Sequence, residues 1–324
     1  MERNVQIRYR ILFMLLVTTF VLCGCQKKVS LQNEYKLENR LVQFEQIGSD
    51  GFSRPFADDI SVATGNDDLG ANLKAEAAAV FEIGGQEVVY EQSAYKRMNP
   101  ASTTKIMTAI VALKYGNLDD LVTVTKDAII TESGSSMAGV KPGDVISLKD
   151  LLYGLMIPSG NDAANAIAVH VGGSIDGFVA MMNQEAHRIG ATGTHFVNAN
   201  GLTDPEHYTT AYDLYLMFHE ALKYDMFRTI IGAHAYNANY VDSNGNPLNA
   251  TWGVGNYYMN GMRETPEGLT VFGGKTGTTQ AAGYCLIMGS RTEDGREFAS
   301  VIMKSANRNT LYDDMSEIIS KIDK

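Results

Sequence analysis

The sequence predicts an α/β (α+β) fold in which helices flank an antiparallel sheet and an all-helical insert interrupts that sheet. Two strand-like segments, at 77–83 and 86–91, stand near the start of the regular part of the chain. Three more stand near its end, and apolar residues at mainly helical spacing fill the stretch between the two groups. This order indicates one sheet that both ends of the domain build.

The first two strands are joined by a Gly-Gly turn at 84–85, which predicts a hairpin. The next apolar run begins at Pro100 and stops near Gly116. A proline at the start and a glycine at the end are typical limits of a helix. A polar loop is expected after 121–124.

The predicted all-helical insert covers about 118–260. Three of its helices follow a residue that can cap their first turn. They are the helix 148–156 after Ser147, the helix between Ser174 and Gly190, and the helix from Thr210 through Leu222. An alanine-rich helix is predicted at 163–169, and an Asn-Gly pair marks a turn within 242–247.

The second group of strands is predicted at 269–272, 284–288 and 298–303, with a hairpin turn at 293–296. An amphipathic helix follows at about 309–322. These elements complete the sheet that the first hairpin begins.

Composition limits the function classes. The 324 residues are 45% hydrophobic and 20% charged, which gives enough core for one large domain or two small ones. A formal charge of −10 and the lack of a basic run argue against a nucleic-acid partner. Beyond the N-terminal segment the one cysteine is Cys285, so no disulfide framework is expected, and its apolar surroundings predict a buried thiol.

The N-terminal segment resembles an export signal. Three arginines precede an apolar run at 11–22, which is shorter than the roughly 20 residues that span a bilayer. The run ends in Leu22-Cys23-Gly24-Cys25, which resembles a bacterial lipobox. The resemblance implies cleavage before Cys25 and a lipid on its thiol. A signal peptide without lipidation and an uncleaved short anchor are the alternatives.

The chain therefore divides into a lipoprotein signal peptide at 1–24, a tether at 25–73 and a folded domain at 74–324. The tether is polar and mixed in charge, and it contains several glycines. This composition favours an extended linker. We expect a bacterial protein that is exported and anchored to the outer face of the cytoplasmic membrane through the lipid on Cys25.

The helix that begins at Pro100 carries a candidate catalytic pair. Ser102 and Lys105 are three residues apart, so a helix places them on one face. A serine hydroxyl needs a base to become a nucleophile, and a lysine whose pKa is lowered by burial and a second cation can be that base. Ser93 and Lys96 share the spacing but lie in a polar loop. The pair at Ser102 indicates a serine acyl-transfer enzyme.

Two further motifs follow the first in order. They are Ser159-Gly160-Asn161, in a loop between two helices, and Lys275-Thr276-Gly277, at the end of an apolar strand. The trio is typical of class A β-lactamases and penicillin-binding proteins. Ser305-Ala306-Asn307 repeats the second pattern but lies beyond the third motif, so we interpret it as a chance match.

Longer stretches of sequence add to the three motifs. Together they make the chain resemble a known family over about 77–306. It resembles the low-molecular-mass penicillin-binding proteins that are D-alanyl-D-alanine carboxypeptidases. The stretches are Pro158 to Ala164, Met182-Asn183, Gly201-Leu202 and His207 to Ala211. The resemblance implies a serine β-lactamase/DD-peptidase-like fold for the domain at 74–324. It also implies removal of the terminal D-alanine from peptidoglycan stem pentapeptides, covalent inhibition by β-lactam antibiotics, and no metal or cofactor.

The same resemblance implies a role for each motif residue. Ser102 would attack the carbonyl between two D-alanines and form an acyl-enzyme. Lys105 would be the general base, kept neutral by the like charge of Lys275. Ser159 would relay a proton to the leaving amine, and Asn161 would hold Lys105 and a substrate carbonyl.

Substrate binding is expected along the third motif. Lys275 and Thr276 would bind the terminal carboxylate by charge-assisted hydrogen bonds. The backbone N–H groups of Ser102 and Thr278 would form the oxyanion hole, where one donor is typically worth roughly 10²–10³ in rate. Gly277, with Gly273 and Gly274, is expected to leave room for substrate along the strand edge.

Two features depart from the family pattern. The chain stops soon after its last strand, so we expect the β-rich C-terminal domain and amphipathic membrane helix of many relatives to be absent. A lipid on Cys25 would replace that membrane attachment. The third motif also continues with Thr278-Thr279, where relatives carry various residues, which would alter substrate preference.

Other functions remain open from the sequence. A β-lactamase would need a glutamate that activates the deacylating water, and no recognisable motif supplies one, so slow deacylation and penicillin sensitivity are expected. A drug sensor or wall-binding lipoprotein on the same fold would acylate and stop. The balance between carboxypeptidase, endopeptidase and transpeptidase activity is also undetermined.

A Ser-His-Asp triad is a further alternative. It would use His207 with Asp204 or Asp213, and Gly134-Ser135-Ser136-Met137-Ala138 is a near match to the Gly-x-Ser-x-Gly elbow. That segment lies in a polar loop, not between a strand and a helix. We therefore interpret His207 as a structural hydrogen-bonding residue.

Overall fold

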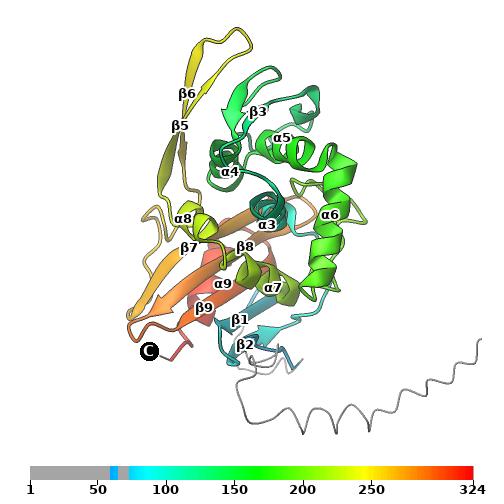
Figure 1. Ribbon diagram of the computed structural model, residues 1–324. Coiled ribbons are helices and arrows are strands. Elements are labelled where there is room, and N and C mark those ends of the chain that lie inside the picture. The colour runs from blue at the N-terminus through cyan, green and yellow to red at the C-terminus, as the bar shows by residue number, and fades with distance from the viewer. Residues whose placement is uncertain (1–58, 65–72, 324) are drawn as a thin grey trace, which may run out of the picture. The chain divides into compact units, whose positions relative to one another are not determined.

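A five-stranded antiparallel sheet and a layer of helices make up most of the computed structural model, which describes residues 59–64 and 73–323 (Figure 1). The strands lie in the order β2-β1-β9-β8-β7. Their bounds are Ala77–Ile83 for β1, Val88–Gln92 for β2, Leu269–Thr279 for β7, Gly283–Thr292 for β8 and Glu297–Ser305 for β9. One antiparallel sheet is thus built from both ends of the domain, as the sequence predicts.

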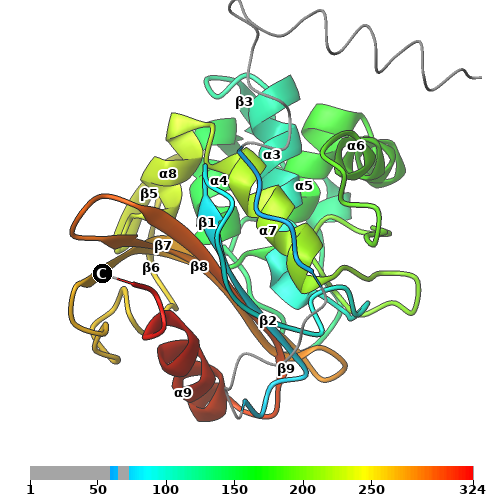
Figure 2. The same cartoon turned by 90° about the horizontal axis from the view of Figure 1, so that it is seen from below.

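Helices cover both faces of this sheet because its strands are apolar on both sides. Val80 and Met288 face a core shared with α9 (Arg308–Ile319), whereas Phe81 and Ile287 face the larger helical layer. Figure 2 shows α9 on one side of the sheet and the other helices on the opposite side. Neighbouring positions on a strand serve different cores, which follows from the two-residue period of a strand.

The larger layer surrounds α3, whose residues Lys105 to Ala112 are all buried. Its helices are α3 (Lys105–Tyr115), α4 (Leu148–Met156), α5 (Asn161–Gly172), α6 (Ile175–Arg188), α7 (Ala211–Ala221) and α8 (Asp225–Ile231). The three predicted caps are confirmed: the side chains of Ser147, Ser174 and Thr210 each accept a backbone N–H three residues on. The 3-10 turns are η1 (Ala101–Thr104) and η2 (Lys126–Ala128).

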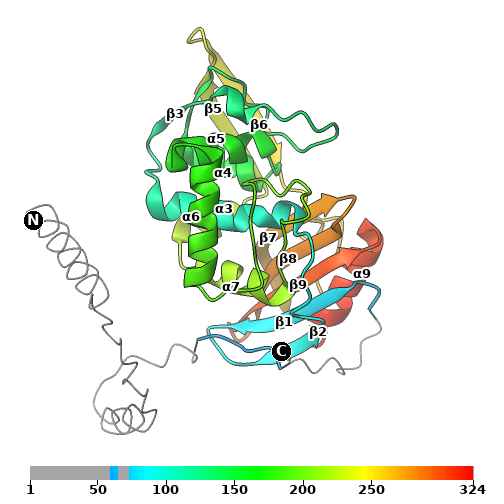
Figure 3. The same cartoon turned by 90° about the vertical axis from the view of Figure 1, so that its right-hand side faces the viewer.

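The prediction that the insert at about 118–260 is all-helical is wrong. It contains a second sheet in the order β3-β4-β5-β6, with bounds Leu121–Thr123, Val145–Ser147, Ala235–Val241 and Pro247–Gly253. The first two strands are too short to show a periodicity. The last two form a projecting hairpin around the Asn244-Gly245 turn (Figure 3). Their exposed positions are alanine, proline, glycine, asparagine and threonine, residue types that are not typical of strands except for threonine, and this hides the strand pattern.

Residues 59–64 pack on the folded domain, so the predicted end of the tether at residue 73 is wrong for this segment. Ile60 forms a β-bridge with Ile83, and the backbone N–H of Ser61 donates to the Tyr215 hydroxyl at 2.9 Å. The predicted signal peptide and Cys25 lie outside the described residues. Within residues 59–64 and 73–323, no helix is long and apolar enough to cross a membrane.

Candidate active site

Ser102 lies in the turn η1 immediately before α3, and its side chain meets the lysine one turn further on. The Nζ atom of Lys105 is 2.9 Å from Ser102 Oγ. The same Nζ is 2.6 Å from Asn161 Oδ1 and 2.6 Å from the carbonyl oxygen of Asn200. The first two sequence motifs therefore converge on one amine.

The surroundings of Lys105 favour a neutral amine. Burial, and then the charge of Lys275, hold its pKa well below the usual value, against the opposing charge of Asp162. A neutral amine has two N–H bonds and one lone pair. If the N–H bonds point to Asn161 Oδ1 and the Asn200 carbonyl, the lone pair is left for the hydroxyl proton of Ser102. This geometry suits a general base that activates a serine.

Lys275 of β7 connects the second and third motifs. Its Nζ donates to Ser159 Oγ at 2.9 Å and to the carbonyl oxygen of Thr276 at 2.8 Å. Burial lowers the pKa of Lys275 to about 7. Ser159 has a φ of +64°, a left-handed conformation that is uncommon outside glycine and often marks functional sites. The loop between α4 and α5 thus fixes the Ser159 hydroxyl beside a second lysine.

The predicted reason for the glycines of β7 is wrong. A β carbon on Gly273 would lie 2.4 Å from the carbonyl oxygen of Ile231, and one on Gly274 would lie 2.3 Å from that of Ile287. A β carbon on Gly277 would lie 3.0 Å from the backbone nitrogen of Ser102. These glycines permit close packing of the protein on itself and do not leave space for substrate.

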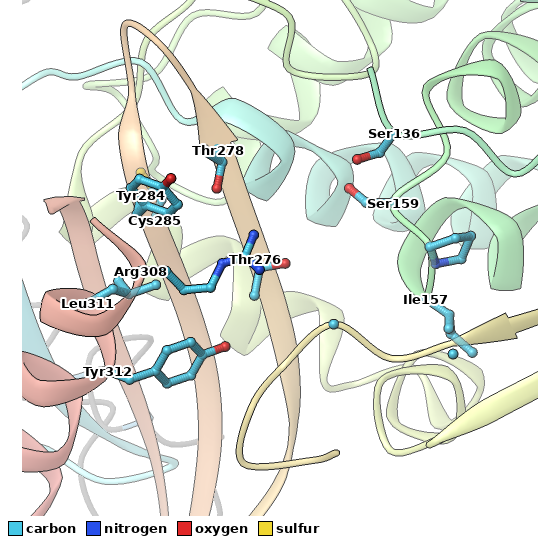
Figure 4. A pocket seen from close by; sticks show the side chains of 13 residues that line it. Ser136, Ile157, Ser159, Thr276, Thr278, Tyr284, Cys285, Arg308, Leu311 and Tyr312 are labelled. Atoms are coloured by element: carbon cyan, nitrogen blue, oxygen red, sulfur yellow. The ribbon is translucent and has the colours of Figure 1, made fainter. Parts of the chain in front are cut away.

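Two adjoining pockets form a cleft between the edge strand β7 and the helical layer. The first, of about 230 Å³, is lined by Ser159, Thr276 and Arg308, among others. The second, of about 160 Å³, is lined by Ser102, Asn161 and residues of the 132–136 loop. Thr278 and Ser136 line both. Figure 4 shows Ser136 and Ser159 on one wall of the first pocket, and Thr276 and Thr278 on the other.

The 132–140 loop is part of the site, although the sequence analysis gave it no role. The carboxylate of Asp162 accepts the backbone N–H groups of Ala138, Gly139 and Val140 at 2.7, 2.7 and 3.0 Å. Because Asp162 follows Asn161 at the start of α5, this contact fixes the loop to the second motif. The sequence signal of this loop is Gly134-Ser135-Ser136, which resembles a nucleophile elbow but forms a wall of the cleft.

Arg308 is a second residue that sequence reasoning missed. It begins α9 and lines the first pocket, with its guanidinium carbon 5.6 Å from the ring centre of Tyr257 and 6.0 Å from that of Tyr284. Its Nη1 also lies 3.4 Å from the Tyr257 hydroxyl. An arginine on the last helix carries no local motif, so only the fold reveals its place beside Thr276.

His207 does not join a catalytic triad. Its Nδ1 accepts the backbone N–H of Val197 at 3.1 Å, so Nε2 carries the proton and donates to Thr104 Oγ1 at 2.8 Å. Burial lowers the pKa of His207 to about 4, which keeps the ring neutral. Both nitrogens are engaged away from Ser102, and the structural interpretation of His207 is confirmed.

Of the remaining sequence candidates, Lys96 and Asn307 lie outside the cleft, whereas Cys285 is among the residues that line the first pocket. Lys96 pairs with Glu76 at 2.7 Å, and Asn307 caps α9. Cys285 is a buried free thiol, as predicted, and burial raises its pKa to about 11. Among the described residues there is no group of three or more His, Cys, Asp or Glu side chains that could hold a metal ion.

The fold and this cleft bring a serine hydroxyl and a buried lysine together, as an active-serine enzyme requires, and comparison with known proteins gives the family of the chain. Residues 62–307 match the family described as Peptidase_S11, D-alanyl-D-alanine carboxypeptidase. The chain belongs to this family of serine-type D-Ala-D-Ala carboxypeptidases, which are extracytoplasmic bacterial cell-wall enzymes.

Named relatives agree with this assignment. The chain is 33% identical to the D-alanyl-D-alanine carboxypeptidase DacF of Bacillus subtilis, over 70% of this chain and 57% of the relative. It is 34% identical to DacC of Escherichia coli, over 77% of this chain and 61% of the relative. The chain therefore spans about 60% of the length of these two relatives.

A solved structure matches more completely. The DD-transpeptidase of Streptomyces K15 superposes with a TM-score of 0.71 at 30% identity, covering 78% of this chain and 97% of that one. The serine β-lactamase/DD-peptidase-like fold is thereby shown for this chain.

Proposed function

We propose that this protein is a carboxypeptidase that removes the terminal D-alanine from peptidoglycan stem pentapeptides through an acyl-enzyme on Ser102. The observation that carries the proposal is the 2.9 Å contact between Ser102 Oγ and the buried amine of Lys105. Lys105 takes the hydroxyl proton as Ser102 attacks the carbonyl between the two D-alanines. Ser159 passes a proton to the leaving D-alanine, and water then releases the acyl group.

The first pocket would bind the C-terminal carboxylate of the substrate. Lys275, Thr276 and Arg308 supply a cation, a hydroxyl and a guanidinium on this side of the cleft. Charge-assisted hydrogen bonds from such groups favour a free C-terminal carboxylate over an amide. The backbone N–H groups of Ser102 and Thr278 would hold the oxyanion, and Asn161 a substrate carbonyl.

β-Lactam antibiotics would acylate the same serine, since they present a reactive carbonyl beside a carboxylate. The location of the enzyme is proposed from its sequence, with a signal peptide at 1–24 and a lipid on Cys25. The tether would end before the segment at 59–64, which packs on the domain. The domain would then act from the outer face of the cytoplasmic membrane.

Transfer of the acyl group to an amine is a second candidate reaction. It is favoured by the relative from Streptomyces K15, which is a DD-transpeptidase. The two reactions share Ser102 and differ only in the acceptor, water or an amine.

The test is D-alanine release from an acyl-D-Ala-D-Ala peptide by the fragment lacking residues 1–25, beside Ser102→Ala. Release that requires Ser102 and stops with penicillin supports the proposal. Adding glycine as an amine acceptor separates hydrolysis from transfer by product mass. A folded protein that binds penicillin covalently but releases no D-alanine would contradict it, and rapid penicillin hydrolysis would instead indicate a β-lactamase.

A further inference from the structure

The second pocket lies on the acyl side of the scissile bond. Thr276 and Arg308 line the first pocket only, Ser102 lines the second only, and Thr278 lines both. With the carboxylate of the substrate held beside Thr276, the peptide must continue past Ser102 into the second pocket. An extended peptide advances about 3.3 Å per residue. The residue before the D-Ala pair lies one residue beyond the D-alanine that acylates Ser102, so it enters the second pocket.

Glu132 is the single charged residue among those that line this second pocket. It is exposed, and no hydrogen bond or ion pair to its carboxylate occurs among the described residues. Its carbonyl oxygen accepts the backbone N–H of Ser135 at 3.4 Å, which closes a turn at the pocket wall. The Oγ atom of Ser135, also in this wall, is buried and has no hydrogen-bond partner in the described structure.

Three side-chain oxygens of the pocket already accept hydrogen bonds from within the protein. The Oδ1 atom of Asn161 accepts from Lys105, and the Oδ1 atom of Asn200 accepts the backbone N–H of Leu202. Thr279 Oγ1 accepts from Thr203 at 3.0 Å. The Glu132 carboxylate at the mouth is not engaged in this way, and it is the one charged group in this lining that can meet a ligand.

The cleft thus has a charge polarity, with Lys275 and Arg308 at its carboxylate end and Glu132 at its acyl end. We propose that Glu132 binds the side-chain ammonium of the residue that precedes the D-Ala pair, and that it makes the enzyme prefer stem peptides in which this amine is free. This inference rests on the proposed function, and it names Glu132 as a specificity residue, not a catalytic one. Acylation or cross-linking of that amine would remove the charge that Glu132 recognises.

The test compares two peptides that differ in one charge: Nα-acetyl-L-Lys-D-Ala-D-Ala and its Nα,Nε-diacetyl form. The wild type should cleave the free-amine peptide with about fivefold higher kcat/KM, the upper range for an exposed ion pair. Glu132→Gln should abolish this preference by slowing the free-amine peptide only, and Glu132→Lys should reverse it. Glu293→Gln, which removes an exposed carboxylate in the β8–β9 turn, should leave the ratio unchanged.

A second substrate pair keeps the inference testable if no peptide is hydrolysed. Ampicillin carries an ammonium on its acyl side chain and benzylpenicillin lacks it, so wild type and Glu132→Gln should differ in the ratio of their acylation rates. Equal ratios in both proteins would overturn the inference. It would also be overturned if Glu132→Gln slowed both peptides equally and delayed release of the penicilloyl group, because the carboxylate would then serve the deacylating water.

Discussion

Gly277 packs against the turn that carries Ser102, at a distance that leaves no room for a side chain. A β carbon there would lie 3.0 Å from the backbone nitrogen of Ser102 and 2.9 Å from the carbonyl oxygen of Pro100. The strand that supplies Lys275 and the turn that supplies the nucleophile are thereby fixed to one another. The third motif requires glycine for this reason.

Gly277→Ala should therefore impair acylation more than stability. The added methyl group must push β7 away from the turn at Ser102, and a shift of about 1 Å in such a site can cost about 10²-fold in rate. The measurements are the second-order rate constant for penicillin acylation and the midpoint of thermal unfolding. Acylation at the wild-type rate would show that the contact does not set the position of Ser102.

The two lysines predict a bell-shaped dependence of kcat/KM on pH. Lys105 must be neutral to act as a base, and its pKa lies well below the usual value, so the rate should fall only as acid protonates it. Lys275 must be charged to bind a carboxylate, and burial lowers its pKa to about 7, so affinity should fall as pH rises through this value. Peptide hydrolysis measured from pH 4 to pH 9 tests both limbs. An alkaline limb that is missing up to pH 9 would contradict the role of Lys275.

Arg308→Gln should raise KM for the peptide about tenfold and change kcat less. The guanidinium is stacked over Tyr257 and Tyr284 at the wall of the first pocket, where it would bind the substrate carboxylate before and during reaction. Arg291→Gln is the matched control, because Arg291 pairs with Glu297 at the other end of β8. Equal effects of the two substitutions would place Arg308 outside the binding site.

Asp162→Asn should destabilise the fold. An amide cannot accept all three backbone N–H groups of the 138–140 segment, and hydrogen bonds to a charged acceptor are worth about 1.5–3 kcal/mol each. We expect a loss of about 2–4 kcal/mol in the free energy of unfolding. Asp127→Asn, at an exposed carboxylate bonded to Thr125, serves as the control and should change stability little. Denaturant unfolding of both variants gives the comparison.

His207→Gln should lower stability while the folded fraction still acylates. The substitution disturbs the hydrogen bonds to Thr104 and Val197, which are buried and structural. Penicillin acylation should stay within about tenfold of the wild type, whereas loss of a triad member typically costs about 10⁴-fold. A loss of about 10⁴-fold in a folded variant would instead support a Ser-His-Asp triad that contains His207.

The sequence predicted most of the large sheet and the helices because their signals are local. Gly84-Gly85 marks the first hairpin, and Ser147, Ser174 and Thr210 mark three helix starts. The small sheet was missed because the exposed positions of its hairpin at 235–253 carry asparagine, proline and glycine, which are uncommon in strands. Short pairing strands also depend on partners far away in the chain.

The candidate site was predictable where residues of one motif lie one helical turn apart, as do Ser102 and Lys105. That three motifs converge could be inferred only from their family resemblance. Arg308 and Glu132 could not be found, since each reaches the cleft through tertiary packing of α9 or of the 132–140 loop. The tight packing of Gly277 likewise depends on two elements that are far apart in sequence.

The central claim is that Ser102, activated by Lys105, forms the acyl-enzyme. Its most direct test is to react the soluble fragment with benzylpenicillin, digest it, and locate the penicilloyl adduct by mass spectrometry. We predict one adduct on the peptide that contains Ser102, and none in Ser102→Ala. An adduct at Ser93, Ser136 or Ser159 that survives Ser102→Ala, or no adduct on a folded wild-type protein, would contradict the claim.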